Sequence, residues 1–135
     1  MSGVKFVTIG GCKYPLSFSF GAVKRLAKKY GGINQMSEAM GNIGNDDMAS
    51  LDILTDVLEV LIYQGCEYMN VIEKGLPPEE GAKVNEKGEY IPASKNEIEL
   101  LMSLDEMTKA AEVIGWMVTG EVGKNSAAAP AEAAE

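Results

Sequence analysis

Hydrophobic and polar residues alternate with a period of two near the start of the chain. In the segment 4–20, VKFVTIGGCKYPLSFSF, two alternating runs flank the pair Gly10-Gly11. Such alternation predicts strands with one buried face, and a glycine pair between them predicts a tight turn. Pro15 lacks a backbone N–H, so the second strand has to turn this position away from a pairing neighbour. We therefore expect a β-hairpin that forms only a small sheet.

The hydrophobic spacing then becomes helical. In 20–30 the apolar side chains share one face and the basic side chains occupy the others, while Ser19 offers an N-cap and Gly31-Gly32 offers a stop. A short helical turn is expected after Asn34, before a turn-rich sequence. The basic helix 20–30 should therefore follow the hairpin directly.

The most extended helical pattern covers 46–74 and predicts a long central helix. Large apolar residues recur along it at helical spacing, and Gly75 followed by two prolines ends it. A second apolar set widens the arc beyond what one neighbouring element can cover: Ile53, Val57, Val60 and Val71. Two interpretations stay open. The arc is either sandwiched between two elements of the same fold or forms a groove or oligomer contact.

Residues 76–92 are rich in proline, glycine and glutamate and predict a connector. A small second hairpin is expected within it, with Val84 and Tyr90 flanking the turn 85–88. The sequence leaves open whether the connector is ordered.

Two capping boxes predict two further helices, 94–103 and 103–119. Each box joins a serine to a glutamate three residues later, as Ser94 with Glu97 and Ser103 with Glu106. Most apolar side chains of the last helix share one face, but Trp116, near Val113, projects from the opposite side. Trp116 is therefore either an interface anchor or a side chain that the connector covers.

Together these elements predict a mainly helical α+β fold with one globular domain over 1–119. A chain of 135 residues, 46% of them hydrophobic, is long enough for a single modest core. The segment 120–135 has no large apolar residue beyond Val122 and ends in AAAPAEAAE. We therefore expect a disordered tail over 120–135.

Charge is distributed unevenly along the chain. The net charge is −8, yet residues 1–37 carry basic side chains and no acidic one. We expect this part to pack against the acidic remainder, or else to bind an acidic partner. The overall acidity opposes binding to nucleic acids and to anionic membranes. Because no apolar run reaches the length of a membrane span and the start lacks a secretory signal, a cytoplasmic location is expected.

Candidate chemistry is scarce. The chain has no histidine, and its isolated cysteines, Cys12 and Cys66, are expected to be small buried apolar residues. Asp52, Asp56 and Glu59 share one side of the central helix, where a metal site can be imagined, but a solvated helix face explains them better. The sequence indicates no enzyme, no catalytic or metal-binding residue and no cofactor. The candidate partner-binding residues are Ile53, Val57, Val60, Val113 and Trp116.

The order of the elements resembles that of the tail assembly chaperones of long-tailed bacteriophages and prophages. The resemblance rests on the strand pair that runs into GAVKRLAKKYGG, the helix LDILTDVLEVLIYQGCEYMN, the acidic connector and the terminal helices IELLMSLDEMTKAAEVIGWMV. It covers most of the chain between Val4 and Thr119. Its content is a pattern of hydrophobicity and length, without an invariant catalytic signature.

The resemblance implies a protein of the host cytoplasm that binds the tape measure protein, keeps its apolar helical surface soluble and helps to recruit tail tube subunits. It implies that the protein is absent from the mature virion. It implies no enzymatic activity. The arc that includes Ile53, Val57 and Val60 would receive an amphipathic segment of the partner. The sequence leaves open whether the protein forms a homo-oligomer. Two other functions also stay open: a structural tail completion or head-tail connector subunit, and a DNA-binding regulator that uses the basic helix.

Overall fold

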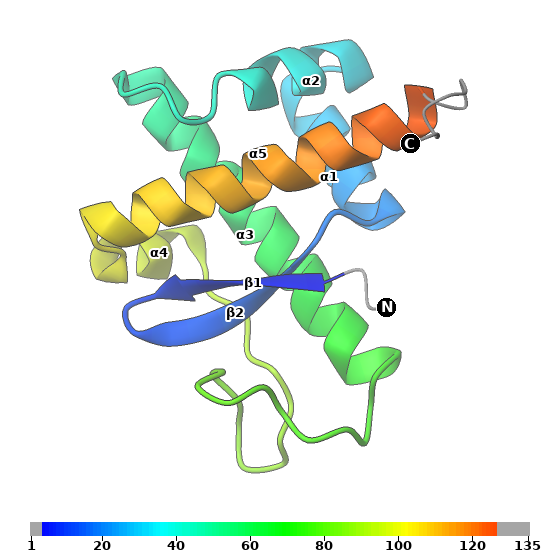
Figure 1. Cartoon of the computed structure of the whole chain (residues 1–135), viewed down its shortest axis with the longest axis vertical. Coiled ribbons are helices and arrows are strands. Elements are labelled where there is room, and N and C mark those ends of the chain that lie inside the picture. The colour runs from blue at the N-terminus through cyan, green and yellow to red at the C-terminus, as the bar shows by residue number, and fades with distance from the viewer. Residues whose placement is uncertain (1–3, 127–135) are drawn as a thin grey trace.

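A two-stranded antiparallel hairpin followed by five helices makes up the part of the chain that the computed structural model describes, residues 4–126, with side chains described to 118 (Figure 1). The elements in chain order are β1 (Val4–Ile9), β2 (Cys12–Ser17), α1 (Phe20–Tyr30), α2 (Ile33–Gly41), α3 (Met48–Val71), α4 (Lys95–Leu101) and α5 (Leu104–Ser126). The mainly helical α+β class and the long central helix expected from the sequence are confirmed.

The hairpin forms where the alternation predicts it. Gly10 and Gly11 make the turn with φ angles of +61° and +84°, which glycine adopts without steric cost. Pro15 stands opposite Phe6 in a sheet that has no third strand among residues 4–126. The outer side of β2 meets the connector instead, where the N–H of Lys13 donates a hydrogen bond of 2.9 Å to Gly81 O.

Helix α3 is the centre of the fold, and other elements cover it on several sides. β2 packs along it, while α1, α2 and α4 also contact it. In Figure 1, α5 crosses in front of α3 above the hairpin. The largest fully buried side chains come from most of these elements and form one core: Ile9, Leu16, Leu26, Leu58, Leu61, Ile62, Ile98 and Ile114.

The expected caps set the helix ends. The Ser19 side chain accepts a hydrogen bond from the N–H of Ala22, and Gly31 ends α1 in the left-handed conformation. The capping box at 94–97 is formed at the start of α4. Helix α3 begins slightly later than predicted, because its N-cap is Asp47, which accepts a 2.8 Å hydrogen bond from the Ser50 N–H.

Helix α5 is longer than predicted. The sequence predicts its end near 119 and a disordered tail from 120, whereas the helix continues to Ser126. No proline interrupts the chain before Pro130, so the backbone can continue the i to i−4 hydrogen bonds. The predicted end of the helix near 119 is therefore too early, while disorder of the tail stays a prediction whose residues 127–135 lie outside the described residues.

The connector folds back onto the end of α3. The side-chain amide of Asn70 donates to the C=O of Tyr90 at 3.1 Å and accepts from the N–H of the same residue at 2.8 Å. The Tyr90 hydroxyl accepts a hydrogen bond from the Glu79 N–H at 2.8 Å. Val84 and Tyr90 pair as an antiparallel bridge, which confirms the small second hairpin.

Glu106 ties the hairpin turn to the start of α5. Its carboxylate accepts hydrogen bonds from the N–H groups of Ser103 at 3.0 Å, Gly10 at 2.9 Å and Gly11 at 3.2 Å. The Ser103 amide, and next the Gly10 amide, stabilise the anion and lower the pKa of Glu106. One carboxylate therefore completes a capping box and anchors a turn far away in the sequence.

We expect Glu106→Gln to destabilise the fold at neutral pH by about 1 kcal/mol, since an amide accepts these bonds more weakly. A carboxylate with a lowered pKa stabilises the fold above its unfolded pKa and loses this effect as the pH falls through its folded pKa. The difference in stability between wild type and variant should therefore become smaller at acidic pH. Thermal unfolding followed by circular dichroism from neutral pH to about pH 3 measures it.

Glu112→Gln, an exposed change on the same helix, serves as the control and should behave like wild type. A difference between Glu106→Gln and wild type that stays constant across the pH range would contradict the assigned role of the charge.

Candidate partner-binding groove between α3 and α5

The predicted partner-binding residues do not form one surface. Val57 is fully buried and belongs to the core, so its assignment to a binding surface is wrong. Ile53 and Val60 are half-buried and pack against the same core. Val113, also half-buried, and the exposed Trp116 belong to α5. At Val57, therefore, the wide arc of α3 is sandwiched inside the fold.

Trp116 projects from α5 as predicted and is 67% exposed. The connector does not cover it, so that alternative is wrong. Its ring lies 4.5 Å from the Lys5 ammonium nitrogen, a distance typical of a cation–π contact. A depression of about 430 Å³ between β1 and α5 is lined by residues that include Val113. Trp116 and Val113 remain candidates for a contact surface on α5.

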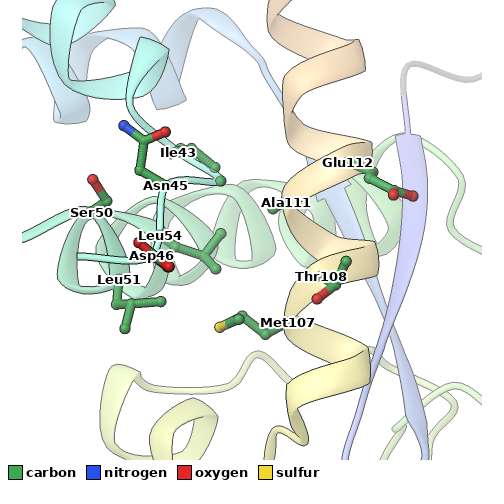
Figure 2. A pocket seen from close by; sticks show the side chains of 11 residues that line it. Ile43, Asn45, Asp46, Ser50, Leu51, Leu54, Met107, Thr108, Ala111 and Glu112 are labelled. Atoms are coloured by element: carbon green, nitrogen blue, oxygen red, sulfur yellow. The ribbon is translucent and has the colours of Figure 1, made fainter. Parts of the chain in front are cut away.

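Two adjoining depressions open between the start of α3 and the start of α5. One, of about 370 Å³, also borders the loop before α3, and the other, of about 240 Å³, also borders α4. Both are lined by Leu51, Leu54 and Met107, so they form one continuous groove, called here the α3/α5 groove. Figure 2 shows Leu54 and Met107 pointing toward each other from the two helices.

The edges of the α3/α5 groove carry highly exposed apolar side chains. Met48 is 80% exposed and Leu104 is 79% exposed, and both line the groove. Each is the first residue of its helix, directly after the caps Asp47 and Ser103. A side chain at the first position of a helix lies at the end of the helix and points toward its N-terminal side. Large exposed apolar side chains beside an apolar groove mark an interaction site more strongly than isolated ones do.

Three of the lining side chains are methionines: Met48, Met102 and Met107. Methionine is unbranched and has three rotatable bonds, so it adapts its shape to different apolar partners. The groove can therefore accept apolar side chains of several sizes without a change of backbone.

The acidic side of α3 differs from the solvated face expected for it. Asp56 is only 8% exposed, and the Lys95 ammonium lies 2.8 Å from a carboxylate oxygen of both Asp52 and Asp56. Lys29 lies 3.6 Å from Asp56, and Glu59 accepts a hydrogen bond from the Lys95 N–H. The hydrogen bond to Asp52, then that to Asp56, raises the pKa of Lys95. The expectation of a solvated face is thus wrong for Asp56, which joins α1, α3 and α4.

The cysteines and carboxylates of the described residues do not form a metal site. Burial raises the pKa of Cys66 to about 12, so it stays a thiol at neutral pH, and Cys12 is half-buried rather than buried. Within residues 4–118, no group of three or more carboxylate or cysteine side chains is placed to hold a metal ion. The α3/α5 groove is therefore the strongest candidate site.

Sequence reasoning misses this groove because it assigns Leu51 and Leu54 to the main stripe of the central helix and does not single out Met48 or Leu104. One signal was available. The segment 100–104, LLMSL, places apolar residues on both sides of a helix cap. These are more apolar side chains than a single helix face can bury.

Comparison with known proteins gives no relative. The chain matches no protein-family model, no curated protein and no solved structure. Among the helices of residues 4–126, none is both long enough and apolar enough to cross a membrane. Function therefore has to be inferred from the groove and from the sequence pattern.

Proposed function

We propose that this protein is a phage tail assembly chaperone that binds the tape measure protein through the α3/α5 groove and keeps it soluble. The observation that supports this function best is an open apolar groove whose edges carry the exposed Met48 and Leu104. A long helical partner with an apolar surface needs such a cover until it is assembled. The same proposal includes recruitment of tail tube subunits, a location in the host cytoplasm and absence from the mature virion. It includes no enzymatic activity.

The groove suits one face of an amphipathic helix. Such a helix inserts apolar side chains spaced three or four residues apart into a groove of this kind. Leu51 and Met107 are half-buried, line both depressions and would contact these side chains, whereas Leu54 beneath them is buried. Burying one leucine-sized side chain contributes roughly 1.5–3 kcal/mol. A few anchors are therefore sufficient for reversible capture, which a chaperone requires.

We expect Met48→Asp and Leu104→Asp each to reduce capture of the partner at least about tenfold, because a carboxylate at the groove edge opposes burial by an apolar helix. Both side chains are exposed, so the helical circular-dichroism signal should not change. The test is co-expression with the tape measure protein encoded by the same phage or prophage genome, followed by affinity capture and measurement of the soluble partner.

Val71→Asp is the matched control, because Val71 is 64% exposed at the opposite end of α3. Equal loss of capture in all three variants would argue against the groove. If the wild-type chain leaves the partner insoluble and instead co-sediments with finished particles, a structural tail subunit is the better explanation.

A further inference from the structure

Acidic side chains border the α3/α5 groove, and no basic side chain lines it. Among the described side chains, its lining includes Asp46, Asp52, Glu99 and Glu112 but neither lysine nor arginine. The chain as a whole carries a net charge of −8, which adds to the negative potential at this surface.

Asp46 and Glu99 are the acids most available to a partner. Both are exposed, and neither carboxylate makes a hydrogen bond or an ion pair with another described residue. Asp52, by contrast, lies 2.8 Å from the Lys95 ammonium. Figure 2 shows the Glu112 side chain turned away from α3, whereas Asp46 comes from the loop before α3 and lines the depression together with Leu54.

The two available acids lie in different parts of the groove. Asp46 lines only the depression next to the loop before α3, and Glu99 lines only the depression next to α4. The apolar side chains shared by both depressions, among them Leu54 and Met107, lie where the depressions join. The groove therefore offers an apolar centre with a free carboxylate in each half.

We propose that the occupant of the α3/α5 groove is an amphipathic helix whose apolar stripe is bordered by lysine or arginine side chains at both ends. This inference rests on the proposed function and specifies the chemistry of the partner segment. Complementary charges increase the rate of association and fix the register of the bound helix. Apolar contacts with Leu51 and the flexible Met107, both half-buried, supply affinity and tolerate different side chains.

Among the described residues, the basic helix of a second copy, α1, does not fit this description. This helix carries lysines and an arginine, but its apolar face, including Ala22 and Leu26, is buried in the core. Unfolding that core would be needed to present the helix. A helix from another protein is therefore the occupant that the charges favour.

Two synthetic helical peptides test the proposal. They share one apolar face and carry either lysines or glutamates at the flanking positions. With the full-length chain, fluorescence anisotropy should show the lysine peptide binding about tenfold more tightly at low salt, the effect of a few exposed charge pairs. The difference should shrink as salt rises, because exposed charges are screened.

A charge-reversed variant makes the test specific to the groove. Asp46→Lys combined with Glu99→Lys should reverse the preference, so that the glutamate peptide binds more tightly. Glu38→Lys combined with Glu67→Lys changes the net charge equally at exposed positions outside the groove and should keep the preference for the lysine peptide. Circular dichroism should show that both variants are folded.

Equal binding of the two peptides to wild type, or the same effect in both double variants, would overturn the proposal. Self-association that Met48→Asp abolishes would overturn it too, since a second copy would then be the occupant. If the chain solubilises the tape measure protein but does not discriminate between the peptides, only the charge inference fails. If it prefers the lysine peptide but leaves that protein insoluble, only the proposed function fails.

Discussion

Val57→Asp is expected to unfold the protein, and not merely to weaken partner binding. Val57 is fully buried in the core that α3 shares with β2 and the neighbouring helices. A carboxylate at this position would lose its hydration inside the apolar core, at a cost of several kcal/mol. This cost is comparable to the stability of a whole domain, about 5–15 kcal/mol. Loss of the helical circular-dichroism signal, or accumulation of insoluble protein, is the measurable result.

Met48→Asp is the matched control for this change, because it introduces the same side chain on the same helix at a position that is 80% exposed. It should unfold in denaturant with a midpoint close to that of wild type. A cooperative, wild-type-like transition for Val57→Asp would show that Val57 is outside the core and would return it to the candidate binding surface.

Local signals made most of the fold predictable. The boundaries of α1 follow from Ser19 and Gly31, and the start of α4 follows from its capping box, because caps act within one turn of the helix. The hairpin follows from alternation and from the glycine pair. Each of these signals involves residues that are close in sequence, and such signals do not depend on how the elements pack.

The sides of α3 that other elements cover could not be predicted in the same way. Helical spacing shows that the apolar arc is wide, but not which segments lie against it. β2, distant in sequence, packs along α3, where Gly65 approaches the backbone of Pro15. The groove opens between the start of α5 and the start of α3, where Leu51 and Met107 line both depressions. Both facts depend on tertiary packing.

The environment of the acidic residues on α3 could not be predicted from the sequence either. Asp52, Asp56 and Glu59 share one side of a helix, which is also the pattern of a solvated face. Their partners, Lys29 and Lys95, come from α1 and from the start of α4. Each acid is thus compensated by a charge or an amide distant in sequence, and this makes the burial of Asp56 possible.

Gly65→Ala is expected to destabilise the protein by at least about 2 kcal/mol, although alanine is the better helix former by about 1 kcal/mol. Helix α3 approaches the hairpin so closely that a Cβ at position 65 would overlap the carbonyl group of Pro15 and lie 2.8 Å from the Leu16 nitrogen. These are backbone atoms of β2, so no side-chain rotation can relieve the overlap. The midpoint of urea unfolding measures the loss.

Gly115→Ala provides the opposite case. Gly115 lies in α5, where an added Cβ would meet no heavy atom within 4 Å among its described surroundings. Alanine should therefore stabilise the protein there by about 0.5–1 kcal/mol through helix propensity alone. If the same substitution lowers the stability at Gly65 and raises it at Gly115, the loss of stability at Gly65 is due to the contact between α3 and β2. If both variants were more stable than wild type, β2 would have to lie farther from α3 at Gly65, and the close contact between these elements would be wrong.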